Sequence, residues 1–567
     1  MIAKELKGLV DKALAELAFK AEGFVVERPG SDKNGDYACN VALVAFRQLA
    51  AATGSKTNSI KMARGGLEFF DTPQQLADKI IEQIKKENHS AIDKMETAGA
   101  GFINFYLTPE FFTNQLKTIL AEGDTFGTSD HIKDYKVMVE YTDPNPFKLF
   151  HIGHLMSNAV GEAVSRIAEA SGAEVKRACY QGDVGLHVAK AIYGLQQGQS
   201  LFEAYTFGNQ AYESDEAAKQ EIMELNKKVY DRSDEAVNKL YDNGRKESLE
   251  YFETIYKKLG TKFDDYFFES ETGEYGKKVV EDNMDVFEKS AGAIVYKGEL
   301  DGLHTRVFIN SEGLPTYEAK ELGLAKIKYD QYPYDYSIIV TSNEIVEYFK
   351  VLLTAMKKIF PELAKKTRHV SHGMLRLPSG KMSSRTGEVI TAESLIDEVK
   401  NKIKDKVKDS HLSEQTLEQI AVGAIKYSIL KQDSSRDIIF DFDKSLSFEG
   451  ASGPYLQYTF ARTQSVLEKA KTEKIEAGIK ELETPREVEK LLARFPEVVY
   501  RAGEELASHH LVTYLTELAS AFNAYYANHK IVSSETNSPY RVALTTAVGQ
   551  TLKNGLTLLG IATPAKM

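Results

Sequence analysis

The spacing of apolar residues changes along the 567-residue chain, and each change predicts a different kind of structure. An amphipathic helix is predicted at the start, where apolar residues recur at helical spacing: Ile2, Leu6, Leu9, Ala13 and Leu17. A glycine turn at 98–101 then leads into an alternating run at 102–107, which is typical of a strand. Residues 1–115 are therefore expected to form a small α+β domain.

The middle of the chain alternates short apolar runs with helical patterns. Strands are predicted at 137–141, 174–180, 293–296, 306–310, 336–341 and 368–375. Helical patterns lie between these runs, and this order favours a doubly wound, Rossmann-like parallel α/β sheet over residues 116–440. A charged, helical stretch at about 195–290 is expected to be an insertion within that domain.

The last part of the chain, residues 441–567, is almost wholly helical in pattern. One apolar face is kept at helical spacing by Leu511, Leu515, Leu518, Phe522 and Tyr525. Such a face needs other helices to cover it, so an all-helical bundle is predicted.

Composition and charge limit the function. The two cysteines, Cys39 and Cys179, are too few for a disulfide framework or a four-cysteine zinc site, which indicates a reducing compartment. The charged residues of the N-terminus exclude a signal peptide, and no uncharged apolar run can cross a bilayer. We therefore expect a cytoplasmic protein without a membrane segment.

The net charge of −11 by itself argues against a nucleic-acid binder, but its distribution is uneven. Basic residues gather at 365–368 and at 400–408. Each cluster is either a solvated helix face or a surface that contacts phosphates. The sequence leaves both interpretations open.

Two motifs carry the candidate chemistry. His151-Ile-Gly-His154 follows the predicted strand at 137–141 and opens a helical pattern. Gly153 allows a planar ligand to approach the backbone, while the helix start and both imidazoles can face an anion. Far downstream, Lys381-Met382-Ser383-Ser384-Arg385 forms a loop that can clamp a triphosphate.

Other nucleotide and metal motifs were not found. The chain has no Gly-x-x-x-x-Gly-Lys-Ser/Thr loop, no His-Glu-x-x-His site and no Cys-x-x-Cys site. Neither a P-loop enzyme nor a structural metal site is therefore predicted.

Together, the two motifs resemble the nucleotide site of class I aminoacyl-tRNA synthetases. Further stretches are similar to arginyl-tRNA synthetases along essentially the whole chain. They lie at 35–40, 101–104, 140–151, 180–185, 313–321, 453–458 and 552–556. The resemblance implies an N-terminal tRNA-binding domain over 1–115, a catalytic domain over 116–440 and a helical anticodon-binding domain over 441–567.

By this resemblance, ATP is bound by Gly153, His151, His154, Lys381 and Met382, and the catalytic residues are His151, His154, Lys381, Ser383 and Ser384. The arginine-binding residues are Glu140, Asn145, Glu269, Tyr317, Glu321 and Glu344. A planar, permanently charged guanidinium needs carboxylates and hydroxyl acceptors around it, which these side chains supply. The chain departs from the family pattern by having Val184 for an aromatic, Glu321 for Asp and Glu344 for Gln.

The implied partners are tRNA(Arg), L-arginine and ATP, and arginine activation is expected to require bound tRNA. The resemblance implies that the arginine carboxylate attacks the α-phosphorus of ATP, giving arginyl-adenylate and pyrophosphate, and that tRNA then accepts the arginyl group. The implied tRNA-binding residues are Phe102, Asn104, Tyr455, Tyr458 and Arg462. We expect Mg²⁺ to arrive with ATP, no tightly bound metal or organic cofactor, and a monomer.

Three alternatives remain at the level of sequence. Another class I synthetase is the nearest. The cysteine-specific type usually needs zinc ligands, which are scarce here, and the branched-aliphatic types carry editing insertions larger than the one in this chain. A small nucleotidyltransferase shares the His-x-Gly-His motif but does not need the two terminal regions. A non-catalytic RNA-binding relative is the third, and the intact loop around Lys381 argues against it.

Overall fold

The structure is a computed structural model that describes residues 1–53, 60–61, 69–377, 390–407 and 412–567. The chain forms two compact units. The first comprises Met1–Gly127, Ser465–Val498 and Ser520–Thr551, and the second comprises Thr128–Gln464, Val499–Ala519 and Leu552–Met567.

The N-terminal part of the first unit is an antiparallel sheet covered by helices. The sheet has the order β1-β2-β6-β5, and β3 pairs with β4. The strands are β1 (Val26–Glu27), β2 (Tyr37–Cys39), β3 (Ile60–Lys61), β4 (Phe69–Phe70), β5 (Ile92–Ala98) and β6 (Phe102–Leu107). The helices are α1 (Ile2–Glu16), η1 (Asp32–Asn34), α2 (Val41–Thr53), α3 (Pro73–Lys86), α4 (Pro109–Glu122) and η2 (Gly123–Thr125). The predicted α+β character is confirmed.

Local sequence explains why α3 forms and which face it buries. Thr72 caps the helix by accepting the N–H of Gln75, and Pro73 occupies the first turn, where its missing N–H costs nothing. Leu76, Ile80 and Ile84 follow at helical spacing and lie in the core between α3 and the sheet.

The second unit is built on a five-stranded sheet in which every neighbouring pair is parallel. Its order is β14-β13-β7-β8-β9. The strands are β7 (Lys136–Glu140), β8 (Glu174–Gln181), β9 (Asp265–Phe268), β13 (Tyr336–Ser342) and β14 (Thr367–His372). The predicted doubly wound parallel sheet is confirmed. The strand order reverses beside β7, and ligands of such sheets bind at that switch point, outside the carboxyl ends of the strands.

Two parts of the strand prediction were wrong. The runs at 293–296 and 306–310 do not join the parallel sheet: β11 (Ala293–Tyr296) pairs antiparallel with β10 (Glu288–Ser290) and β12 (Arg306–Ile309). Strand β9 lies inside the stretch that was expected to be a helical insertion. A short apolar run indicates a strand but not its partner, and four residues between long helices give little periodic signal.

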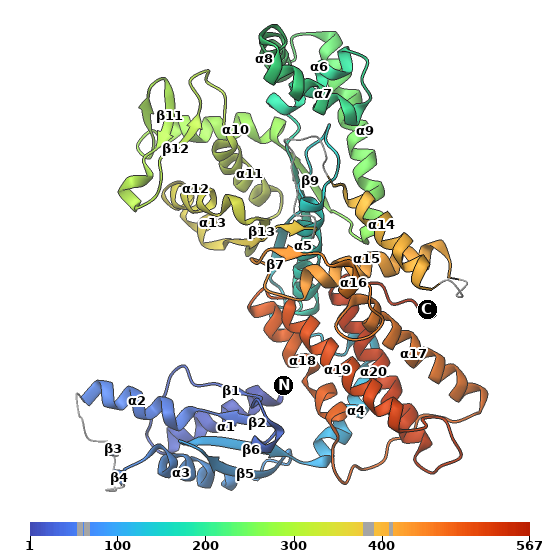
Figure 1. The fold of residues 1–567 in the computed structure, drawn as a ribbon. Helices are drawn as coiled ribbons and strands as arrows, with labels where there is room; N and C mark the ends of the chain where they lie inside the picture. Colours follow the sequence, from blue (N-terminus) through green and yellow to red (C-terminus); the bar gives the residue numbers. More distant parts are fainter. Residues whose placement is uncertain (54–59, 62–68, 378–389, 408–411) are drawn as a thin grey trace. The chain divides into compact units, whose positions relative to one another are not determined.

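The helices that accompany the parallel sheet in this unit are α5 (Ile152–Ala170), α6 (Leu186–Gln196), α7 (Leu201–Ser214), α8 (Glu216–Asp231), α9 (Glu235–Leu259), α10 (Glu269–Asp282), η3 (Gly298–Asp301), α11 (Tyr317–Gln331), η4 (Asn343–Ile345), α12 (Val346–Ile359), α13 (Pro361–Lys366), α14 (Ala392–Lys406), α15 (Glu414–Leu430) and α16 (Phe442–Ser445). Helix α5 packs on the parallel sheet, whereas α6, α7 and α8 cluster together apart from the sheet (Figure 1). Figure 1 shows α10 and α11 beside the small sheet of β11 and β12. A further pair, β15 (Leu375–Arg376) and β16 (Ile438–Ile439), is parallel.

The C-terminal region is helical, as predicted. Its helices are α17 (Gly453–Thr472), α18 (Glu487–Glu504), α19 (His509–Asn528) and α20 (Ser538–Leu558). Leu511, Leu515, Leu518, Phe522 and Tyr525 are all buried, as their spacing on α19 requires. Across the described residues, the model contains no helix with the length and apolarity of a membrane span.

Candidate active site

The loop that joins β7 to α5 is held in an unusual backbone conformation at the switch point of the sheet. Thr142, Asp143 and Phe147 have φ values of 82°, 49° and 68°, a left-handed region that side chains disfavour. Buried hydrogen bonds hold the loop: Ser157 Oγ accepts the Thr142 N–H at 2.9 Å, and Ser248 Oγ accepts the Phe147 N–H at 2.9 Å. Strain that persists under such restraints is a feature of ligand sites.

His151 and His154 form the N-terminal cap of α5. His151 Nδ1 accepts the Gly153 N–H at 3.1 Å, and His154 Nδ1 accepts the His151 N–H at 3.3 Å. The two rings stack with centroids 3.7 Å apart. Since each Nδ1 is an acceptor, the proton of each neutral imidazole is on Nε2.

Both histidines are held neutral at pH 7. Burial, and then the charge of Lys148, lower the pKa of His151 to about 4. Burial and the neighbouring His151 lower the pKa of His154 well below its usual value. The pair therefore offers two neutral Nε2–H donors at the positive end of a helix, where an anion is favoured.

Two of the predicted acidic residues are already paired with buried lysines. Glu140 Oε2, at the end of β7, lies 2.6 Å from Lys328 Nζ. Glu269 Oε2, at the start of α10, lies 2.6 Å from Lys320 Nζ. All four side chains are at most 4% exposed. Neither lysine was predicted, because each lies on α11, far from its partner in the sequence.

Asn145 and Glu269 come together around Gly182. A Cβ atom at position 182 would lie 2.4 Å from Asn145 Oδ1 and 3.0 Å from Glu269 Oε1. A side chain at this position would displace Asn145 Oδ1, so the absence of a Cβ at Gly182 lets these two polar groups converge.

Glu321 differs from the other acids of the site. It is half-buried on α11, and within the described ranges its carboxylate has no hydrogen bond and no ion pair. Burial, and then the negative charge of Glu140, raise its pKa well above the usual range. An unpaired, partly buried carboxyl of this kind is a candidate site for a cation, whose positive charge would favour its ionised form.

The other two residues predicted to bind the substrate arginine, Tyr317 and Glu344, are exposed. Tyr317, the first residue of α11, is 58% exposed and lines a cavity of about 460 Å³. Glu344 lies in η4, directly after the carboxyl end of β13. Tyr317 is close to the paired acid of the site, because Lys320 Nζ, which pairs with Glu269, lies 5.4 Å from the centre of the Tyr317 ring.

The same cavity contains cationic side chains that the sequence analysis missed. It is lined by Lys148, His187, Lys190, Tyr205, Tyr317 and Lys320. Lys190 donates to Asn209, but Lys148 has no carboxylate partner among the described residues and lies over the Tyr205 ring. Burial and the neighbouring Lys190 lower the pKa of Lys148 to about 8. Its position three residues before His151 was the signal that could have identified it.

The predicted loop residues Lys381, Met382, Ser383 and Ser384 lie outside the described residues. The chain that follows them does pair beside the histidine cap. Ile390 O accepts the Ile152 N–H at 3.2 Å, and Phe150 O accepts the Ala392 N–H at 2.9 Å. Residues 390–392 therefore lie alongside the start of α5.

Comparisons with known proteins agree with this fold and domain order. The protein-family model with the description "tRNA synthetases class I (R), catalytic domain" matches residues 115–442. The arginyl-tRNA synthetase N-terminal domain matches 4–107, and the DALR anticodon binding domain matches 456–567. The chain belongs to the arginyl-tRNA synthetase family. It is an arginine–tRNA ligase, a class I enzyme that joins arginine to tRNA.

Individual relatives span nearly the whole enzyme. The arginine–tRNA ligase of Flavobacterium psychrophilum is 30% identical over 541 residues, which cover 87% of this chain and 90% of the relative. That of Fusobacterium nucleatum is 30% identical over 564 residues, covering 94% and 93%. The solved Thermus thermophilus arginyl-tRNA synthetase has the same fold, with a TM-score of 0.76 at 24% identity over the full length of both chains.

The predicted tRNA-binding residues of the synthetase differ in accessibility. On β6, Phe102 is 41% exposed, whereas Asn104 is buried, which favours a structural role for Asn104. On α17, Tyr455, Tyr458 and Arg462 are half-buried, and the Arg462 guanidinium lies 4.9 Å from the centre of the Tyr458 ring.

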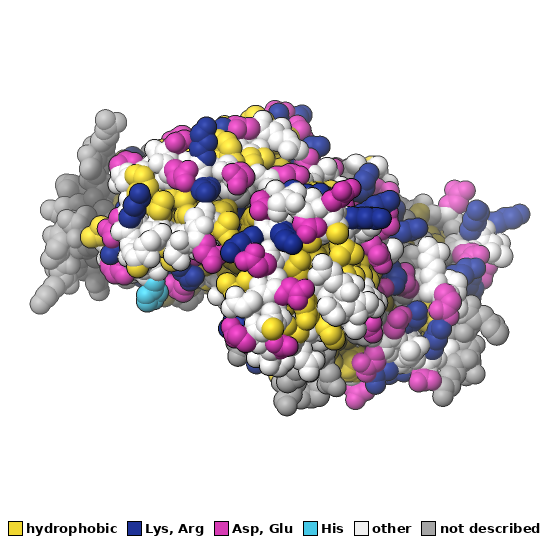
Figure 2. All heavy atoms as spheres, turned by 90° about the horizontal axis from the view of Figure 1, so that it is seen from above, with side chains coloured by type: hydrophobic (Ala, Val, Ile, Leu, Met, Phe, Trp, Pro, Cys, Tyr) yellow, Lys and Arg dark blue, Asp and Glu magenta, His cyan; other side chains and the backbone are white. Residues whose placement is uncertain are grey.

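The two basic clusters of the synthetase carry local acidic partners. Lys400 pairs with Asp397, Lys402 with Glu398, and Lys365 with Glu362. On the face shown in Figure 2, Lys and Arg side chains are likewise interspersed with Asp and Glu. These pairs favour solvated helix faces over phosphate-contacting surfaces.

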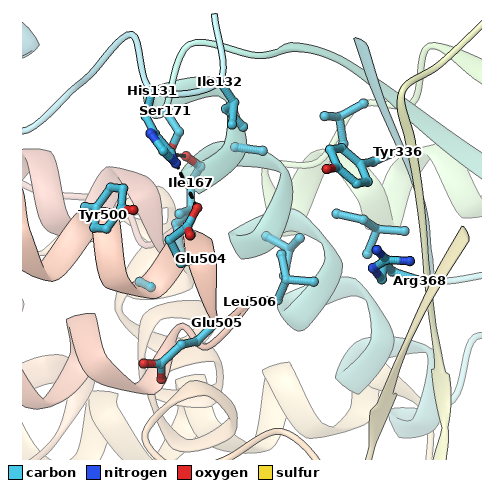
Figure 3. A pocket seen from close by; sticks show the side chains of 16 residues that line it. His131, Ile132, Ile167, Ser171, Tyr336, Arg368, Tyr500, Glu504, Glu505 and Leu506 are labelled. Carbon is cyan, nitrogen blue, oxygen red and sulfur yellow. Dashed lines mark hydrogen bonds and ion pairs between the residues drawn. The ribbon is translucent and has the colours of Figure 1, made fainter. Parts of the chain in front are cut away.

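A second cavity of the synthetase, of about 400 Å³, lies at the amino ends of the strands (Figure 3). Its wall is largely aliphatic, with Val137, Val164, Ile167 and Ile338 among its residues. At its rim, His131 Nε2 lies 2.9 Å from Glu504 Oε1, the pair joined by a dashed line in Figure 3. None of the predicted site residues lines it.

Proposed function

We propose that L-arginine binds at the carboxyl ends of β7 and β8, with its guanidinium against Glu321. The unpaired carboxylate of Glu321 is the observation that carries this assignment. In this proposal Glu269 and Tyr317 act as further hydrogen-bond acceptors for the guanidinium, and Glu344 lies at the edge of the site. Glu140 and Asn145, on the loop side, hold the α-amino and α-carboxylate groups.

ATP lies across the start of α5 in this proposal. The Nε2–H groups of His151 and His154 donate to phosphate oxygens, and Gly153 lets the nucleotide approach the helix start. The arginine carboxylate attacks the α-phosphorus in line, which forms arginyl-adenylate and releases pyrophosphate. The protein contributes positioning and charge stabilisation rather than a covalent intermediate.

Further charge stabilisation in this step comes from lysines. Lys148, which lacks a carboxylate partner among the described residues, is placed to meet an anionic group near the histidines. Lys381, Met382, Ser383 and Ser384 keep their sequence-based role of binding ATP and the departing pyrophosphate. Mg²⁺ enters with ATP and neutralises phosphate charge. No protein ligand is assigned to it, since the described residues include no group of three metal-binding side chains.

The tRNA is bound by the terminal regions. Three functional domains are proposed over 1–115, 116–440 and 441–567. Phe102 is exposed enough to stack on a base, and the face of Tyr455, Tyr458 and Arg462 meets the anticodon loop. Asn104 supports the strand that presents Phe102. The enzyme is proposed to act as a cytoplasmic monomer.

ATP–pyrophosphate exchange tests the arginine assignment. Each of the twenty amino acids is assayed with and without arginine tRNA. Exchange should occur with arginine and tRNA together, and Glu321→Gln should raise the KM for arginine while leaving that for ATP within about threefold. Equal exchange with lysine, or an unchanged KM for arginine in Glu321→Gln, would contradict the assignment.

The tRNA assignment has a separate test. Tyr458→Ala should weaken tRNA binding by about 1–3 kcal/mol if the ring stacks on a base. Charging of anticodon-swapped transcripts by the variant and the unmutated enzyme measures this. Equal loss on native and swapped transcripts would leave Tyr458 with only a packing role.

A further inference from the structure

Lys320 lies in the proposed arginine site and already forms an ion pair with one of its carboxylates, that of Glu269. Its Nζ is 2.6 Å from Glu269 Oε2 and 3.2 Å from the Tyr230 hydroxyl, and it lies 5.4 Å from the centre of the Tyr317 ring. Both Lys320 and Glu269 are 4% exposed. The pair is therefore a desolvated ion pair within the binding site rather than a surface contact.

The charge of Lys320 is stable in this position. Burial acts to lower the pKa of Lys320, but the charge of Glu269 outweighs it and holds the pKa above its ordinary value. Lys320 thus remains a cation throughout the neutral pH range, and it neutralises Glu269 before any substrate arrives.

The next residue on α11 has the opposite property. Successive residues of an α-helix point about 100° apart, so Lys320 and Glu321 face different neighbours. Glu321 has no cationic partner in the described part of the chain, while Glu140 is paired with Lys328. Asp143 is the other acid of this group without an ion pair there, and it accepts the Tyr180 N–H at 2.8 Å.

We propose that Lys320 is a positioning residue that sets the charge of the amino-acid site. By neutralising Glu269, it leaves Glu321 as the carboxylate that receives the guanidinium. Two of the four acids, Glu140 and Glu269, are paired with Lys328 and Lys320, whereas Glu321 and Asp143 have no ion pair among the described residues. A guanidinium in this site therefore meets carboxyl groups that no lysine already neutralises.

This pairing has a physical consequence for specificity. Without Lys320, the carboxylate of Glu269 would add its negative charge beside Glu140, Asp143 and Glu321, and the site would take up a proton or an extra cation. With Lys320 present, one permanently charged guanidinium completes the site, and a neutral side chain of the same shape does not. The role of Lys320 rests on the proposed function, because it requires arginine to bind beside Glu321.

A double-mutant cycle on Lys320 and Glu269 tests the role. Glu269→Gln leaves Lys320 as an unpaired cation facing the substrate, so the KM for arginine should rise roughly tenfold to a hundredfold. Adding Lys320→Met removes that cation and should recover at least about tenfold of the loss. The KM values for ATP and tRNA should change by less than about threefold in both variants.

Two further variants keep the result interpretable. Lys320→Arg retains the charge and should stay within about threefold of the unmutated KM for arginine. Lys326→Met, which breaks the exposed pair with Asp330 on the same helix, is the matched control and should have no effect. Lys320→Met alone leaves the buried carboxylate of Glu269 without its ion-pair partner, which can prevent folding. The decisive variant is therefore the double substitution Glu269→Gln with Lys320→Met, and thermal melting checks that it folds.

The outcomes separate the two proposals. If the double variant binds arginine as poorly as Glu269→Gln or worse, Glu269 contacts the guanidinium with its own charge and the role of Lys320 is overturned. If Glu321→Gln leaves the KM for arginine unchanged, the arginine site itself is wrongly placed, whatever the cycle shows. Recovery in the double variant together with a large effect of Glu321→Gln supports both.

Discussion

The two ends of the parallel sheet of the second unit carry cavities of similar size and different chemistry. The cavity at the carboxyl ends, of about 460 Å³, is lined by Lys148, Lys190 and Lys320 together with tyrosines. The one at the amino ends, of about 400 Å³, is largely aliphatic, and at its rim His131 pairs with Glu504. Cavity size therefore does not distinguish the two ends of the sheet, whereas buried charge without an ionic partner does.

The difference follows from the topology and from what each end must do. At the carboxyl ends, Lys148 and Glu321 lack ionic partners among the described residues, and burial shifts the pKa of both. Such groups cost stability unless a ligand completes them, so they are retained where a ligand binds. The switch point of the strand order lies at this end.

The largest expected effect is the loss of a phosphate donor at the carboxyl end. His154→Ala should slow arginine-dependent ATP–pyrophosphate exchange by roughly 10²–10³-fold, because one positioned donor to developing charge is removed. Its helix-capping role adds a stability loss of only about 1 kcal/mol, so the variant should fold. Arg368→Ala, at the amino-end cavity, is the control and should remain within about twofold. A normal rate in His154→Ala would contradict the proposal that ATP reacts at the carboxyl end of the sheet rather than at the amino end.

The next effect concerns the unpaired acid. Glu321→Gln should weaken arginine binding by about 2–5 kcal/mol, the usual loss when one partner of a desolvated charge pair is truncated. The KM for arginine, measured in the charging reaction, reports this. Glu504→Gln makes the same chemical change at the amino-end rim and should leave that KM unaltered. Similar shifts in the two variants would mean that a general electrostatic effect, not the pocket, is responsible.

A smaller effect should appear in the dependence of stability on pH. The pKa of His151 is lowered to about 4 by burial, against about 6.5 in the unfolded chain. Between pH 6.5 and 4 the His151 imidazole binds a proton in the unfolded chain but not in the folded one. The free energy of unfolding should therefore fall as pH falls through this window. Thermal melts of the unmutated enzyme and His151→Gln at pH 4.5 to 7 test this. The variant should lose less on acidification, and an identical slope would contradict the buried, neutral state.

The smallest effect is expected at the amino-end cavity. Val164→Leu adds one methylene to the aliphatic wall, and Leu favours the helix more than Val, so stability should rise by up to about 1 kcal/mol. Thermal melting measures this, and the charging rate should stay within about twofold. A large loss of activity would show that this cavity is coupled to the reaction after all.

Much of the fold could be predicted because local patterns determine local structure. The strand predicted at 137–141, the helix start at the His151-Ile-Gly-His154 motif and the buried face of α19 each depend on residues close together in the chain. The same locality explains the errors. The strands at 293–296 and 306–309 were recognised, but their antiparallel partners are a property of the folded chain.

The sequence by itself determined the family, most of the element types and the identities of the acids and histidines that are proposed to act. Only the tertiary structure decided which of those acids are neutralised. Lys320 lies 51 residues from Glu269, and Lys328 lies 188 residues from Glu140, yet each pair is joined at 2.6 Å. An ion pair depends on distance and burial rather than on spacing along the chain, so no local pattern could distinguish paired Glu269 from unpaired Glu321.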